Sequence, residues 1–226
     1  MSLLVKKLVK GLKEENKINL NKRQIEVLEE ISHFINKEIY KNPFINIFKE
    51  KKDGIYLFGP AGRGKTLVMS SVNVSLNSKV SSQIHFNDLI FKLQKFDFSS
   101  RNIKKELLSK NIFFKKQKIL CIDELDINNF ADIIILKKFI YEASSLKIFL
   151  IFTSNKSPEN LYRNNHHKKE IKEFFDNIHK SFHTIELKTK FDYRTKFSNF
   201  SKLFFNRKKD TNNKNMALLK KRIVGN

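Results

Sequence analysis

Residues 59–66 have the spacing of glycine, lysine and threonine that is typical of the phosphate-binding P-loop, G-x-x-x-x-G-K-[ST]. A short apolar run precedes this stretch and an apolar segment follows it, which predicts a strand, a loop and a helix in that order. In such a loop, backbone N–H groups converge on one anion and the following helix directs its positive end at it. We therefore expect the following residues to bind a nucleotide: Gly59, Pro60, Ala61, Gly62, Arg63, Gly64, Lys65 and Thr66.

Two side chains of this loop are suited to the chemistry of ATP. Lys65 is expected to contact the β- and γ-phosphates, and the Thr66 hydroxyl is expected to ligate Mg²⁺. The expected cofactors are therefore ATP and Mg²⁺.

A second pair of candidate residues follows a run of four apolar residues, 119–122, which predicts a strand that is buried on both faces. Asp123 and Glu124 come at its carboxyl end, where α/β sheets bind ligands. This is the Walker-B pattern, in which Asp123 would hold Mg²⁺ through water and Glu124 would polarise the attacking water. The pattern alone is weakly informative, but together with the P-loop it is specific.

A third candidate is Asn155, which follows the apolar run 147–153. An amide at that position can orient water against a γ-phosphate, the sensor-1 role. An alternative is that Asn155 only caps a turn before Pro158. With the two other motifs present, we assign catalytic roles to Lys65, Glu124 and Asn155.

The apolar runs predict the elements that must position these residues. Strands are expected at 54–58, 83–86, 119–122, 147–153 and 182–187, with helical crossovers between them. We therefore predict an α/β fold of the additional-strand type of P-loop NTPase, with a five-stranded, mainly parallel sheet of order 5-1-4-3-2. Expected helices include 22–40 with Asn21 as N-cap, one capped by Asn87, 130–143 and 159–180.

The chain of 226 residues is expected to contain an N-terminal helical segment at 1–45, a P-loop ATPase core at 46–195 and a basic, flexible tail at 196–226. Residues 1–15 carry apolar residues at helical spacing and are expected to form a helix docked on the core. A peripheral membrane contact is the alternative for this helix.

The net charge of +22 is typical of proteins that bind nucleic acid or anionic membranes. Only seven of the 45 basic residues are Arg, however, and Lys, Asn, Ile and Phe are abundant, which favours a compositional origin of the charge.

The single cysteine, Cys121, excludes a disulfide framework. With no apolar run near the roughly 20 residues of a spanning helix and no signal-peptide pattern, we expect a cytoplasmic protein.

The motifs together resemble one family, the ATPase family gene 1-like group that includes the ZapE cell-division ATPases. The resemblance covers about residues 5–195. It rests on these segments: Gly54–Gly59 with Gly62–Thr66, His85-Phe86, Leu120–Glu124, Ala131-Asp132 with Leu136, Thr153–Asn155 with Pro158 and Leu161-Tyr162, and Asp192–Arg194.

The resemblance implies a cytosolic ATPase that acts near the inner membrane during division, with the tubulin-like ring protein FtsZ as partner and with possible self-association. Only 32 residues follow Arg194, so we expect the C-terminal part of the family to be lacking. The arginine that the family places where a neighbouring subunit could be reached is Lys168 here. Lys168, Arg163 and Arg194 are the candidates for stabilising charge in the transition state, and hydrolysis by the isolated chain is expected to be slow.

Two other functions stay open. The first is a nucleic-acid-associated ATPase of the helicase-loader type, which the basic charge favours. The second is a nucleotide-binding scaffold with little hydrolysis, which Lys168 and the short C-terminus favour.

Overall fold

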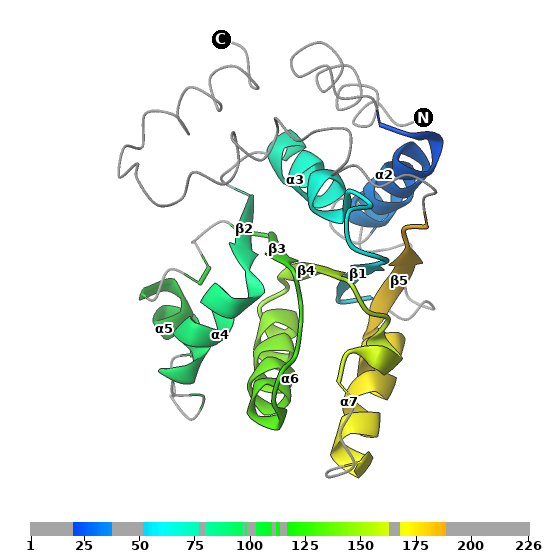
Figure 1. Ribbon diagram of the computed structural model, residues 1–226. Helices are drawn as coiled ribbons and strands as arrows, with labels where there is room; N and C mark the ends of the chain where they lie inside the picture. Colours follow the sequence, from blue (N-terminus) through cyan, green and yellow to red (C-terminus); the bar gives the residue numbers. More distant parts are fainter. Residues whose placement is uncertain are drawn as a thin grey trace, which may run out of the picture.

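The computed structural model describes residues 20–37, 52–76, 80–96, 98, 103–109, 112–113, 117–162 and 168–188. Figure 1 shows their arrangement as one sheet between two layers of helices. The elements are, in chain order, α2 (Lys22–Ile35), β1 (Gly54–Phe58), α3 (Lys65–Ser75), β2 (Ser81–His85), α4 (Phe86–Gln94), α5 (Ile103–Ser109), β3 (Ile119–Asp123), α6 (Phe130–Ser145), β4 (Phe149–Ser154), the short 3₁₀ helix η3 (Pro158–Asn160), α7 (Lys168–Ser181) and β5 (Phe182–Glu186).

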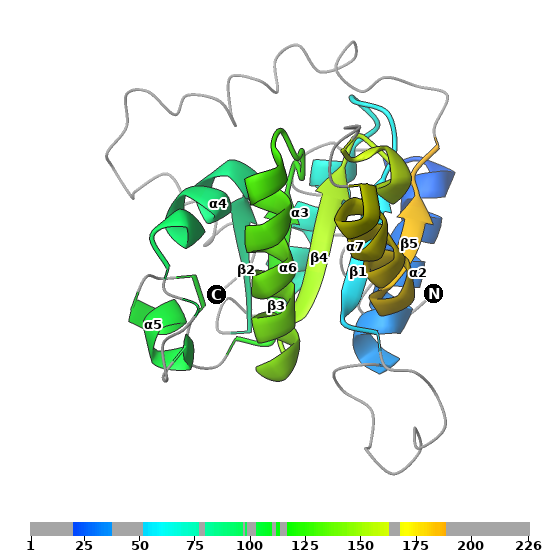
Figure 2. The ribbon, with the colours of Figure 1, turned by 90° about the horizontal axis from the view of Figure 1, so that it is seen from below.

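The five strands form a single sheet of order β2-β3-β4-β1-β5, which can be followed across Figure 2. Every neighbouring pair is parallel. This confirms the predicted α/β fold and the predicted order 5-1-4-3-2. Because the strands are parallel, their carboxyl ends share one edge of the sheet, and the residues after β1, β3 and β4 are brought together there.

The burial of the strands follows from their places in the sheet. The central strands β3 and β4 are buried along their whole length, because helices cover both of their faces. Strand β2 lies at the end of the sheet and is more polar and more exposed. Alternate side chains of β1, β3 and β4 therefore contribute to two separate cores, one against α2 and α3 and the other against α4, α6 and α7.

Helix α2 begins with a capping box. The Asn21 side chain accepts a hydrogen bond from the Gln24 N–H, and the Gln24 side chain accepts one from the Asn21 N–H. Asn21 is thus the N-cap, as predicted. The apolar stripe of the helix, which includes Val27, Leu28 and Ile31, is fully buried on the α3 side of the sheet.

The start of α4 differs from the prediction. We expected Asn87 to cap this helix after a strand at 83–86, but β2 ends at His85 and the helix begins at Phe86. His85 is the N-cap, and its side chain accepts a hydrogen bond from the Asn87 N–H. The reason is the register with β3, which pairs His85 with Asp123 and so ends the strand one residue earlier.

The predictions for 1–15 and 196–226 lie outside the described residues, as do residues 38–40 of the helix expected at 22–40. Within the part of the chain that the structure describes, no helix is long and apolar enough to cross a membrane.

Candidate functional site

The loop at residues 59–66 follows β1 and leads directly into α3, the order predicted for a P-loop. Gly64 is the N-cap of α3 and has a φ of 86°, a left-handed conformation that favours glycine. A Cβ on Gly64 would lie 2.3 Å from the Nε2 of Gln24. The backbone conformation therefore favours glycine here, and a Cβ would also displace the Gln24 amide from its place against the loop.

Lys65 is buried, with 8% of its surface exposed, and its Nζ points back across the loop. It donates to the carbonyl oxygens of Gly59 at 2.8 Å and Pro60 at 2.9 Å. It also donates to the Oδ1 of Asn155 at 2.8 Å. The P-loop lysine and the predicted sensor-1 amide are thus in direct contact, although 90 residues separate them in the chain.

Asp123, at the end of β3, is 7% exposed, and its carboxylate is hydrogen-bonded both to the start of α3 and to β4. Its Oδ1 accepts hydrogen bonds from the Thr66 hydroxyl at 3.2 Å and from the Thr153 hydroxyl at 2.5 Å. The backbone N–H of Glu124 donates to both Asp123 and Thr153. These bonds fix the carboxylate beside the first turn of α3, where a cation bound to phosphates would lie.

Glu124 has a φ of 56°, and 59% of its side chain is exposed. Its Oε2 lies 2.9 Å from the Nε2 of His85. Because the Asn87 N–H donates to the Nδ1 of His85, the proton of the neutral ring is placed on Nε2, which donates to Glu124. Sequence analysis did not identify His85 as part of the site. Its signals in the sequence were the expected strand before α4 and the family resemblance, which includes His85-Phe86 but gave His85 no role.

The segment around Asn155 is held by its neighbours in the fold. The Ser154 hydroxyl donates to the carbonyl oxygen of Leu125 at 2.7 Å, and the Tyr56 hydroxyl donates to that of Lys156 at 3.0 Å. Burial raises the pKa of Tyr56 well above its usual range, so this hydroxyl keeps its proton. Asn155 itself is exposed, and its side chain contacts the loop through the hydrogen bond from Lys65.

The side chains of this site are suited to bind a nucleotide together with a divalent cation. Thr66 and Asp123 supply oxygen atoms, which are the ligands that Mg²⁺ prefers, and Mg²⁺ usually takes its other ligands from phosphates and water. The Nε of Arg63 is buried and has no hydrogen-bond acceptor among the described residues. A buried donor without an acceptor is costly, and an anionic ligand at the loop is a suitable acceptor.

Of the remaining predicted residues, Lys168 is the first residue of α7, and Arg163 and Arg194 lie outside the described residues. Their proposed roles in charge stabilisation stay predictions. The residues that the structure does bring together are Lys65, Thr66, Asp123 and Asn155.

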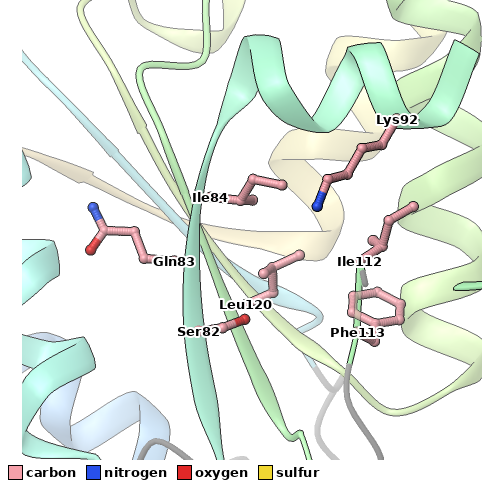
Figure 3. A pocket seen from close by; sticks show the side chains of 7 residues that line it. All are labelled: Ser82, Gln83, Ile84, Lys92, Ile112, Phe113 and Leu120. Carbon is pink, nitrogen blue, oxygen red and sulfur yellow. The ribbon is translucent and has the colours of Figure 1, made fainter. Parts of the chain in front are cut away.

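A cavity of about 270 Å³ opens beside β2, but it is not part of this site. Its lining includes Ile84, Lys92, Ile112 and Phe113, on the side of the sheet covered by α4. Figure 3 shows Gln83 pointing to the opposite side of β2, where its side chain accepts a hydrogen bond from Ser70 of α3. The strand therefore separates this cavity from the P-loop side.

Comparison with known proteins gives a family and a fold. A family model described as AFG1-like ATPase matches residues 11–225. Lactation elevated protein 1 homolog B from Danio rerio is 25% identical over 178 residues, which are 68% of this chain and 35% of that protein. Cell division protein ZapE from Escherichia coli (strain K12) is 25% identical over 143 residues, which are 62% of this chain and 38% of that protein.

These alignments span little more than a third of either relative. Among solved structures, the crystal structure of DnaI is similar with a TM-score of 0.51 and 21% sequence identity, covering 78% of this chain and 88% of that chain. At this identity the similarity shows the fold alone.

Proposed function

Because this chain belongs to the AFG1-like ATPase family, we propose that it binds ATP at residues 59–66 and hydrolyses it to ADP and phosphate. The observation that carries the proposal is the contact of Lys65 with Asn155 at 2.8 Å, next to the contact of Thr66 with Asp123 at 3.2 Å. The start of α3, the end of β3 and the residue after β4 supply these four side chains. Their convergence at one edge of the sheet is what phosphoryl transfer to water requires.

In the proposed reaction, the oxygen of a water molecule forms a bond to the γ-phosphorus while the bond to the β–γ bridging oxygen breaks. Lys65 binds oxygens of the β- and γ-phosphates, and Asn155 orients the attacking water. Glu124 accepts the proton that this water loses. His85 donates to Glu124 and holds the carboxylate in one orientation.

Thr66 and Asp123 are the residues that would hold Mg²⁺. When bound, the cation neutralises charge on the β- and γ-phosphate oxygens. The protein would hold the Asp123 carboxylate in one orientation toward the cation through the hydrogen bonds from Thr66 and Thr153.

The experiment that tests this function compares the wild-type chain with Lys65→Ala. The lysine supplies a cation to the phosphates, so the variant should bind ATP at least about tenfold more weakly, which corresponds to about 1.4 kcal/mol. Titration of a fluorescent ATP analogue measures the affinity, and phosphate release measures turnover. Equal affinity in the two proteins would refute nucleotide binding at this loop.

The similarity to ZapE supports a more specific proposal, a role in cell division with FtsZ as the partner. This proposal comes from the family resemblance and not from a surface of the molecule. The test is sedimentation of FtsZ polymers with and without the chain in ATP. Co-sedimentation that depends on ATP and is lost in Lys65→Ala would support it, and no co-sedimentation would refute it.

The net charge of +22 favours a second candidate, a nucleic-acid-associated ATPase. Phosphate contacts release counterions, so the affinity for single-stranded DNA should fall steeply as salt rises. A titration of a fluorescent oligonucleotide at several salt concentrations measures this slope. Absence of binding at low salt would exclude this candidate.

A further inference from the structure

Gln24, in the first turn of α2, is a fully buried amide that contacts two segments far apart in the sequence. Its Oε1 accepts a hydrogen bond from the Asn21 N–H at 3.1 Å. Its Nε2 donates to the carbonyl oxygen of Arg63 in the P-loop at 3.0 Å. Gln24 therefore uses both ends of its side chain, one to begin α2 and the other to bind the loop.

The helix that carries Gln24 is itself firmly held. Leu28 and Ile31 are fully buried in the core that α2 shares with α3, and the two helices lie side by side in Figure 1. Arg23 donates to the carbonyl oxygen of Glu186 at 3.1 Å. Gln24 thus projects from an element with little freedom to move, as a positioning side chain requires.

The contact with Arg63 fixes the direction of one peptide unit. In a planar trans peptide, the C=O and the following N–H point in opposite directions. Since the Arg63 carbonyl points at Gln24, the N–H of Gly64 points away from α2. The amide of Gln24 also packs against the Cα of Gly64, which has room for no Cβ there. This peptide cannot rotate without losing its hydrogen bond to Gln24.

We propose that Gln24 is a positioning residue for nucleotide binding, which by holding the Arg63 carbonyl directs the N–H of Gly64 at a phosphate of the bound nucleotide. The inference rests on the proposed binding of ATP at residues 59–66. It extends that function to a residue outside the motif, in a helix that begins more than thirty positions earlier in the chain.

The test uses Gln24→Glu. A glutamate at this position of a capping box still accepts the Asn21 N–H, so α2 keeps its cap. The carboxylate has no hydrogen to donate, however, and it places a negative charge against the Arg63 carbonyl. We expect ATP affinity at pH 8 to fall by about tenfold or more, because the peptide loses its fixed direction.

Lowering the pH provides a measurement that would not change if Gln24 only stabilised the structure. Burial raises the pKa of a carboxyl group, and a protonated carboxyl can again donate to the Arg63 carbonyl. The ratio of variant to wild-type affinity should therefore recover when the pH is lowered from 8 to about 5.5, below which an ordinary carboxyl also begins to protonate. Because the variant and the wild type are compared at the same pH, the protonation of ATP affects both affinities equally and cancels in the ratio.

Two controls accompany the variant. Asn21→Ala removes the N-cap side chain but keeps both partners of the contact between Gln24 and Arg63, so it should lower thermal stability and change ATP affinity by less than about twofold. Gln24→Met keeps the length and burial of the side chain without an amide. Its ATP affinity should be reduced by a similar factor at both pH values. If Gln24→Glu does not fold, Gln24→Met replaces it as the test variant.

The outcomes separate the two proposals. Loss of affinity in Lys65→Ala with full affinity in Gln24→Glu at pH 8 would overturn the role of Gln24 alone. An equal loss in Asn21→Ala and Gln24→Glu, without recovery on acidification, would also overturn it and assign the effect to α2 stability. Unchanged affinity in Lys65→Ala would overturn the proposed function, and this inference with it.

Discussion

Replacement of Glu124 by Gln is the sharpest test of the proposed chemistry. The amide has nearly the shape of the carboxylate and can still accept a hydrogen bond from His85, which lies 2.9 Å away. It cannot accept the proton of the attacking water. We therefore expect hydrolysis to slow by about 10²-fold or more, which corresponds to a barrier higher by about 2.7 kcal/mol.

The structure also predicts what this substitution leaves unchanged. The Glu124 side chain is 59% exposed and is directed to His85. Its backbone N–H, which donates to Asp123 and Thr153, is the same in Gln. ATP affinity in the variant should therefore stay within about twofold of wild type, because no contact of the loop or of the expected Mg²⁺ ligands is removed.

Single-turnover phosphate release, with the protein in excess over ATP, measures the chemical step without product release. Titration of a fluorescent ATP analogue measures affinity on the same samples. Glu124→Ala is the matched control, because it removes the contact with His85 as well and should be slowed at least as much. Wild-type turnover in Glu124→Gln would show that Glu124 is not the base.

Three further predictions concern residues around the site. Thr153→Val keeps the shape of the side chain but removes the hydroxyl that donates to Asp123. The free energy of unfolding, measured with urea, should therefore fall by about 1–3 kcal/mol, and an unchanged unfolding midpoint would refute the role of this hydrogen bond. Lys168→Arg should raise ATP turnover in an assembled sample, and an unchanged rate there would direct attention to Arg163 or Arg194. Burial raises the pKa of Cys121 to about 12, so a thiol reagent at pH 8 should modify it only as fast as the protein unfolds, and rapid modification of the folded chain would contradict this.

The sheet, and the convergence of Lys65, Thr66, Asp123 and Asn155 at one edge of it, could be predicted from the sequence because both leave strong local patterns. Residues 119–122 and 149–152 are continuous apolar runs, which is what strands covered on both faces require. The polar residues that follow them mark the carboxyl ends. Once the strands and their order are known, parallel pairing alone brings Asp123 and Asn155 to the loop.

The sequence did not predict the contacts that depend on side-chain reach between elements. His85 and Asn87 are both polar residues before α4, and capping preference alone favours Asn87. The register of β2 with β3 instead places His85 opposite Asp123, beside Glu124. Gln24 received no role from the sequence, and nothing near it in the chain indicates that its amide binds Arg63.

The hydrogen bonds of Lys65 bear on the order of events in the proposed reaction. The Lys65 ammonium group donates to oxygens of Gly59, Pro60 and Asn155. A phosphate oxygen that reaches Lys65 competes with these acceptors, and Asn155 is the one that belongs to a different loop. In the proposed reaction, a phosphate that replaced Asn155 at Lys65 would leave the Asn155 amide able to bind water. Under that proposal, the water-positioning group would become available only when ATP is bound.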